Sequence, residues 1–251
     1  VVLIETTYGD RRHADVLMED ELAPLLSKLA ARGGVAVVPV FAVGRAQQLQ
    51  LAITRLKEAG RIPATLPVFL DSPMAVSATR LLGEHLGAHR LSHTELARMA
   101  RGTTLVETSE ESKALAGLHG PRVILAASGM ATGGRVLHHL ALHAGHHRNL
   151  ILLTGYQTPG TRGARLAAGE KTLRMLGQEV SIRAQVEQLQ SASAHADAEQ
   201  LLAWLQQVQP APARVFVTHG DMGASDALRQ RIEHGLRWRA QVPRAGASYT
   251  V

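Results

Sequence analysis

The sequence contains no cysteine among its 251 residues, which excludes disulfide bonds and thiolate metal sites. Aromatic residues make up only 3% of the chain, so the core must be built from Leu, Val, Ile and Ala, and few rings remain for nucleobases to stack on. No apolar run approaches the roughly 18 residues that a membrane-spanning helix needs, and no signal peptide is visible. These absences favour a globular protein of the reducing cytoplasm with no membrane contact.

Two further absences concern chemistry and completeness. The chain has no Gly-x-Ser-x-Gly elbow and no thiol, so nothing supports a serine or cysteine hydrolase. It begins at Val1, in the middle of an apolar run, rather than at a methionine with a polar lead-in. We expect from this start that the sequence is the C-terminal portion of a longer protein; the alternative is a processed mature chain.

Positive charge, in contrast, is in excess. Lys and Arg number 27 against 21 Asp and Glu, which gives a formal charge of +6 and a pI near 10.3. A basic balance attracts polyanions through counterion release. Because the excess is modest, it makes nucleic acid one candidate partner, with the phosphate backbone as the handle, and does not single it out.

Apolar runs alternate with amphipathic stretches along most of the chain. This alternation predicts parallel βαβ units, and because the longest strands are nearly all apolar, the sheet should be covered on both faces. Asp197, with Gln200 three residues later, predicts a capping box at a helix start. We expect strands at residues 1–5, 35–41, 67–70, 104–106, 123–127, 150–154, 180–189 and 215–218, and helices at 15–31 (with Pro24 at a start or kink), 47–59, 74–86, 136–142 and 198–208.

Two histidines and one carboxylate stand at strand ends. His195 lies in Ser193-Ala194-His195-Ala196-Asp197, His219 in Val217-Thr218-His219-Gly220-Asp221, and Glu5 closes the first apolar run. A buried carboxylate needs a partner, and a histidine is a natural one, since the pair favours an imidazolium that can act as a general acid. The alternatives are solvated loop histidines and an edge-strand Glu5 facing water.

Two other groups of residues are open to two interpretations. The loop from Ser128, Gly129 and Met130 to Arg135 is glycine-rich and lies between a strand and a helix, so it is either an anion cradle or a tight βα turn. A second group contains only histidines. Because no carboxylate accompanies it, we interpret it as no native metal site; its members are His138, His139, His143, His146 and His147.

Seven short motifs in chain order resemble the β-CASP branch of the metallo-β-lactamase-fold nucleases, over essentially the whole chain. They are Glu5-Thr6-Thr7-Tyr8-Gly9-Asp10-Arg11, Pro39-Val40-Phe41-Ala42-Val43-Gly44-Arg45-Ala46-Gln47, Leu70-Asp71-Ser72-Pro73-Met74-Ala75, Ser128-Gly129-Met130 with Gly133-Gly134-Arg135, Gly155-Tyr156-Gln157 with Gly160-Thr161, Ser193-Ala194-His195-Ala196-Asp197, and His219-Gly220. The resemblance implies an α/β fold: a β-CASP parallel-sheet domain with helices on both faces, plus the C-terminal part of a metallo-β-lactamase αββα sandwich. Residues 1–9 would end the first sandwich half, 10–190 would form the β-CASP domain, and 191–251 would complete the sandwich.

The resemblance also implies roles for individual residues. Glu5 and His195 would be catalytic, the carboxylate bonding a general-acid histidine, and His219 would be a ligand of one of two zinc ions. Ser128, Gly129, Met130, Tyr156 and Gln157 would line the RNA-binding cleft. The family's main metal motif, His-x-His-x-Asp-His, does not occur in this sequence.

The implied function is that of a zinc-dependent ribonuclease that hydrolyses phosphodiester bonds by a two-metal mechanism, acting on single-stranded RNA, with a homodimer as one candidate assembly. Because most metal ligands are missing, we expect this chain alone to be inactive. Two alternatives stay open: a non-catalytic nucleic-acid-binding scaffold, and a DNA-directed nuclease of the same family.

Overall fold

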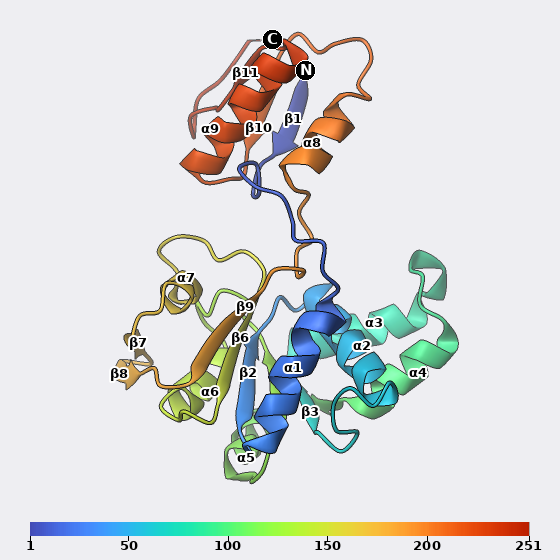
Figure 1. Cartoon of the computed structure of the whole chain (residues 1–251), viewed down its shortest axis with the longest axis vertical. Helices are drawn as coiled ribbons and strands as arrows, with labels where there is room; N and C mark the ends of the chain where they lie inside the picture. The colour runs from blue at the N-terminus through green and yellow to red at the C-terminus, as the bar shows by residue number, and fades with distance from the viewer. Residues whose placement is uncertain (251) are drawn as a thin grey trace. The chain divides into compact units, whose positions relative to one another are not determined.

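The computed structural model of the protein describes residues 1–250, and the chain forms two compact units (Figure 1). We call Val16–Ala192 the large unit, and Val1–Asp15 with Ser193–Val251 the small unit. Each unit is built on its own parallel sheet. The two ends of the chain therefore fold together, and the large unit is inserted between them in sequence.

The large unit is organised by a six-stranded sheet in the order β4-β3-β5-β2-β6-β9, in which every pairing is parallel. Residues of β2, β5 and β6 are buried throughout, as expected for strands covered on both faces. The strands are β2 (Val35–Pro39), β3 (Val68–Asp71), β4 (Thr104–Val106), β5 (Arg122–Ala126), β6 (Leu150–Thr154) and β9 (Gln185–Leu189).

Helices cover both faces of this sheet, which confirms the fold class expected from the sequence. One face packs against α1 (Met18–Ala31), α2 (Arg45–Glu58) and α3 (Pro73–Glu84), and the other against α6 (Val136–His143) and α7 (Arg162–Ala167). Further helical segments of the unit are α4 (His93–Gly102), α5 (Ser109–Ala114) and the 3₁₀ turns Leu86–Ala88 and Leu115–Gly117.

Two details of the large unit differ from expectation. Residues 180–189 are not one strand: β7 (Thr172–Met175) and β8 (Gln178–Ser181) form a separate antiparallel hairpin, and only β9 joins the large sheet. The break occurs because the N–H groups of Arg183 and Ala184 both donate to the carbonyl oxygen of Ala144, which turns the chain. Of the start or kink expected at Pro24, the start is wrong, because α1 begins at Met18 and Pro24 lies inside it.

The small unit has a three-stranded parallel sheet in the order β1-β10-β11. Its strands are β1 (Val2–Glu5), β10 (Val215–Thr218) and β11 (Ala240–Gln241), and its helices are α8 (Ala198–Leu205) and α9 (Met222–Arg231), which continues into a π-helical turn over Ile232–Leu236. Ile4, Val215 and Val217 pack against both helices. On edge strand β1, Leu3 points away from this core and is 70% exposed.

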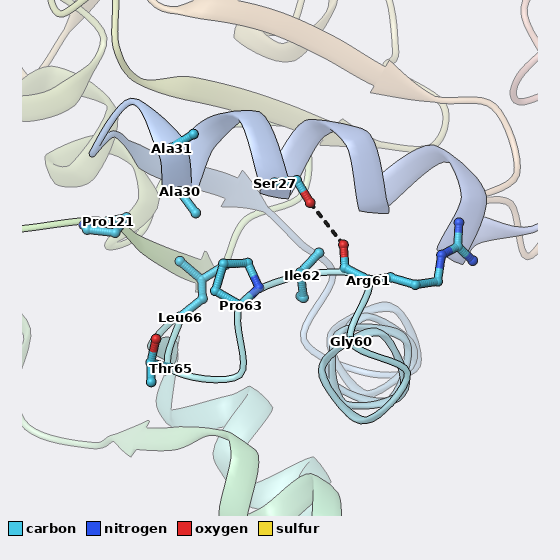
Figure 2. Close-up of a pocket in the computed structure, with 10 residues that line it drawn as sticks. All are labelled: Ser27, Ala30, Ala31, Gly60, Arg61, Ile62, Pro63, Thr65, Leu66 and Pro121. Atoms are coloured by element: carbon cyan, nitrogen blue, oxygen red, sulfur yellow. Dashed lines mark hydrogen bonds between the residues drawn. The ribbon is translucent and has the colours of Figure 1, made fainter.

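Among the described residues, no helix combines the length and the apolarity needed to cross a lipid bilayer. A cavity of about 610 Å³ lies in the large unit between α1 and the loop that follows α2 (Figure 2). Ser27 Oγ donates a 2.9 Å hydrogen bond to the carbonyl of Arg61 at its wall. Gly60–Leu66 and Pro121 precede strands β3 and β5, so this cavity is at the amino ends of the strands, and none of the predicted site residues line it.

Candidate active site

The register of the small sheet brings two strand ends together. Strand β1 pairs with β10 so that Glu5 lies beside Thr218, and the two strands are parallel. Both therefore end at the same edge of the sheet, where loops of α/β proteins commonly carry functional side chains. Thr7 follows Glu5 by two residues, and His219 directly follows β10.

The loop that carries His219 has an unusual backbone conformation and packs closely against the loop after β1. His219 has a φ of 64°, in the left-handed region that few residues other than glycine adopt. The next residue, Gly220, lies so close to Thr6 that an added Cβ would be 2.4 Å from the Thr6 carbonyl oxygen. The absence of a side chain at Gly220 thus lets the loop after β10 press against the loop after β1.

The loop that carries His195 is held by Asp197. Tyr8 and Asp197 form an isolated parallel bridge, and the N–H groups of His13 and Gln200 both donate to the Asp197 carboxylate, at 2.9 Å each. Burial raises the pKa of Asp197, but the hydrogen bonds from Gln200 and His13 outweigh it and lower the pKa below its usual value. The predicted capping box is present, since the Gln200 side chain accepts the N–H of Asp197 at 3.0 Å.

These loops bring Glu5, His195 and His219 into one group. Glu5 Oε2 lies 3.3 Å from Nδ1 of His195, and the rings of His195 and His219 stack with centroids 5.3 Å apart. The potential ligand atoms of the three residues all lie within 4.8 Å of one another. Glu5 also accepts the N–H of Thr7 at 2.8 Å, so its carboxylate is fixed from the backbone as well as by the histidine.

The ligand atoms that these three side chains offer are of types that zinc binds in proteins. Imidazole nitrogen and carboxylate oxygen are both usual zinc ligands, and within residues 1–250 this is the one set of three or more such side chains close enough to hold a metal. These three side chains are only part of the ligand set of the family's metal site, because the His-x-His-x-Asp-His motif does not occur in the chain. The arrangement can therefore contribute a ligand and an acid–base pair to a larger site.

The predicted substrate-binding residues lie in the large unit, in loops that leave the carboxyl ends of β5 and β6. Gln157 Nε2 donates to the carbonyl of Gly129 at 3.2 Å, and Thr158 Oγ1 contacts Met130 Sδ at 3.2 Å. These contacts join the loop of Ser128, Gly129 and Met130 to the loop of Tyr156 and Gln157.

The structure also shows how the glycine-rich loop after β5 uses its polar groups. The N–H of Ala131 donates to the Ser128 carbonyl, and the N–H of Thr132 reaches Ser128 Oγ. The Ser128 hydroxyl lies 2.9 Å from Thr132 Oγ1. Two N–H groups of the loop are thus used internally, which is typical of a tight βα turn rather than an anion cradle.

The histidine-rich helix contains an interaction that the sequence did not indicate. His139 Nε2 lies 2.6 Å from Asp71 Oδ2, at the end of β3, and Arg135 Nη1 donates to Asp71 Oδ1 at 2.8 Å. Burial raises the pKa of Asp71, but hydrogen bonds from His139, Ser112 and Arg135 lower it below the usual value. Asp71 was visible as a carboxylate after an apolar strand, but its partners lie on other elements.

Fold and site together define the class: an α/β protein with a carboxylate–histidine group at the carboxyl edge of a parallel sheet. The description "Beta-Casp domain" matches residues 46–166, and "Zn-dependent metallo-hydrolase RNA specificity domain" matches residues 179–243. The chain belongs to the β-CASP family of metallo-β-lactamase-fold proteins.

Curated relatives agree with this assignment. The chain is 39% identical over 229 residues to "Ribonuclease TTHA0252" of Thermus thermophilus, covering 88% of the chain and 51% of the relative. It is 32% identical over 250 residues to "Transcription termination factor FttA" of Methanosarcina mazei, covering 94% and 39%. It is 30% identical over 251 residues to "RNase J-like protein" of Methanocaldococcus jannaschii, covering 98% and 58%. The chain thus spans 39–58% of the length of these three relatives.

Proposed function

We propose that this chain is the β-CASP and C-terminal part of a zinc-dependent ribonuclease that hydrolyses phosphodiester bonds of single-stranded RNA with two metal ions. The observation that carries the proposal is the convergence of Glu5, His195 and His219, from opposite ends of the chain, on one edge of the small sheet. The matched zinc-dependent metallo-hydrolase description and the relatives named ribonuclease support it.

In this proposal the three residues have different tasks. Nδ1 of His195 faces the Glu5 carboxylate at 3.3 Å, which leaves Nε2 of the ring to exchange a proton with the leaving oxygen of the cleaved bond. His219 offers an imidazole nitrogen as a zinc ligand. When bound, zinc would polarise the phosphate and lower the pKa of an attacking water.

The large unit would supply most of the contact with the RNA backbone. Residues 16–192 contain 19 of the 27 Lys and Arg but only 13 of the 21 Asp and Glu, so the whole formal excess of +6 belongs to this unit. Phosphate contacts of this kind provide affinity without sequence readout. The loops of Ser128–Met130 and Tyr156–Gln157 would line the RNA path.

The test uses the parent protein with its upstream sequence, zinc, and a 5′-labelled single-stranded RNA beside DNA of the same sequence. We expect His195→Ala and His219→Ala each to lower kcat by about 100-fold or more, the scale of lost acid–base or metal catalysis. His234→Ala, an exposed histidine on the turn after α9, is the matched control and should cleave normally.

Three other results would redirect the proposal. Undiminished cleavage by both site variants would refute the roles assigned here. A parent protein that binds RNA without cutting it would support a scaffold, and preferential cutting of the DNA strand would support a DNA-directed nuclease. The isolated 251-residue chain should not cleave RNA, because it holds only part of the metal ligand set.

A further inference from the structure

A single hydroxyl group touches both histidines of the candidate site. Thr7 Oγ1 lies 3.3 Å from Nδ1 of His195 and 3.2 Å from Nδ1 of His219. Thr7 itself is 3% exposed, whereas the His195 side chain is 39% exposed and His219 is exposed, so the hydroxyl contacts each ring from the buried side of the group.

Thr7 is held by one contact of its own backbone and by two contacts of the neighbouring Thr6. Its own N–H donates to Glu5 Oε2 at 2.8 Å. The neighbouring Thr6 donates through Oγ1 to the carbonyl of Ala224 at 3.1 Å, and Gly220 packs against the Thr6 backbone. The backbone that carries the Thr7 hydroxyl is therefore held by Glu5 and, through Thr6, by the loop that carries His219.

The number of hydrogen bonds that the Thr7 oxygen can accept determines whether it can bond both imidazole rings. A hydroxyl oxygen has two lone pairs and can accept two N–H donors. On His195, Nδ1 also faces the Glu5 carboxylate at 3.3 Å, and an ionised carboxylate only accepts, so this Nδ1 carries a hydrogen. The Thr7 oxygen can accept the same N–H and has a second lone pair left for His219.

We propose that Thr7 is a positioning residue whose hydroxyl accepts Nδ1–H from His195 and His219 together, and so holds both rings in the tautomer with a bare Nε2. The bare Nε2 of His219 is then a zinc donor, and that of His195 exchanges a proton with the leaving oxygen. The hydrogen bond that one ring nitrogen of a histidine makes determines whether the other nitrogen carries a hydrogen or can bind a metal. The catalytic consequence rests on the proposed function, whereas the tautomers themselves do not.

The first experiment measures the tautomers directly in the metal-free 251-residue chain. Long-range ¹H–¹⁵N spectra of ¹⁵N-histidine-labelled protein, with chelator at about pH 8.5, where an imidazole in water is neutral, distinguish Nδ1–H from Nε2–H. His195→Gln and His219→Gln assign the two sets of signals among the 13 histidines. We expect both rings to be predominantly Nδ1–H.

Two variants and a control isolate the hydroxyl. Thr7→Val keeps the shape and removes the acceptor, so His219 should shift toward Nε2–H, while His195 keeps its proton on Nδ1 through Glu5. Thr7→Ser should restore the wild-type signals. Thr218→Val, which removes a nearby hydroxyl that donates to the carbonyl of Ile4, should leave both tautomers unchanged.

Several results would overturn the proposal. A wild-type spectrum with either ring protonated on Nε2 does so whether or not the variants fold. An unchanged His219 in folded Thr7→Val also does so. In the parent protein, Thr7→Val should weaken zinc affinity, measured by chelator competition, by about 10- to 100-fold, and unchanged affinity would contradict the role. Because the tautomer readout uses no RNA and no metal, it separates failure of this inference from failure of the proposed nuclease activity.

Discussion

Asp71 at the end of β3 and His139 on α6, 68 positions apart in the chain, are joined by a 2.6 Å hydrogen bond in the interior of the large unit. The Asp71 carboxylate is fully buried, and it also accepts from Ser112 Oγ at 2.5 Å and from Arg135. A buried charge with this many donors ties α5 and α6 to the sheet. Removing the Asp71 carboxylate should therefore lower the unfolding free energy of the whole large unit.

We expect Asp71→Asn to destabilise the large unit by about 3 kcal/mol, because it leaves Arg135 without its counter-charge and places an amide N–H₂ against donors. Ser112→Ala should cost about 1 kcal/mol, since Asp71 keeps its other partners. Urea unfolding followed by far-UV circular dichroism measures both. Both tryptophans, Trp204 and Trp238, lie in the small unit, so their fluorescence follows that unit separately from the large one. Equal costs for the two variants would contradict the charge argument.

The buried ring of His143 makes the large unit sensitive to acid. Burial lowers the pKa of His143 to about 4, with help from Arg122, His139 and His146, and its Nε2 has no hydrogen-bond partner. In the unfolded chain an imidazole has a pKa near 6.5, so unfolding takes up a proton between these values. The stabilising effect of keeping this ring neutral is present above about pH 6.5 and is lost as the pH falls toward 4.

From these two pKa values, wild type should lose about 2–3 kcal/mol of unfolding free energy through His143 between pH 7.5 and pH 4.5. His143→Leu has a similar volume and cannot titrate, so it should lose that much less over the same range. The measurement is urea unfolding of both proteins at the two pH values by circular dichroism. A His143→Leu profile parallel to the wild-type profile would show that this ring is not the source.

Local patterns were sufficient for most of the fold and for part of the site. The apolar runs at 35–41, 123–127 and 150–154 predicted the buried strands β2, β5 and β6, because continuous burial leaves a continuous apolar signature. The prediction of a single strand at 180–189 was wrong, because two N–H groups in that run donate to the carbonyl of Ala144, which is distant in sequence.

The site shows the same limit. Glu5, His195 and His219 were visible because each stands at the end of a strand-like run within a short motif. The contacts of Thr7 with two histidines and of Asp71 with His139 were not visible, because they form only when segments distant in the sequence fold together. Pairings of this kind leave no periodic signal in one sequence.

The carboxylate of Asp197 should matter both as a helix cap and as a link to the loop before it. Asp197→Ala removes the acceptor for His13 and Gln200 N–H groups and should destabilise the small unit by about 2 kcal/mol. Asp197→Asn keeps one acceptor oxygen and should cost about half as much. Since the pKa of Asp197 is lowered by folding, its contribution is present above the unfolded value near 3.9 and is lost as the pH falls below it. Tryptophan fluorescence during urea unfolding at pH 7 and pH 3 measures this, and a wild-type advantage that persists undiminished at pH 3 would contradict it.

Two glycines three residues apart provide the sharpest test of how the site is closed. A Cβ at Gly220 would meet Thr6 backbone and side-chain atoms at 2.4–2.9 Å, and neither group can withdraw without moving β1. At Gly223, in the first turn of α9, the nearest atom is Asp221 Oδ1 at an ordinary 3.5 Å. Gly220→Ala should therefore destabilise the small unit by about 1–3 kcal/mol, the usual cost of overpacking. Gly223→Ala should be neutral or stabilise it by up to about 1 kcal/mol, because alanine is the better helix former.

Tryptophan fluorescence during urea unfolding ranks the stabilities of the two variants, and the histidine NMR signals of Gly220→Ala should shift because Thr7 is displaced. Equal stability of the two variants would mean that the loop after β10 does not rest on Thr6 as the structure shows.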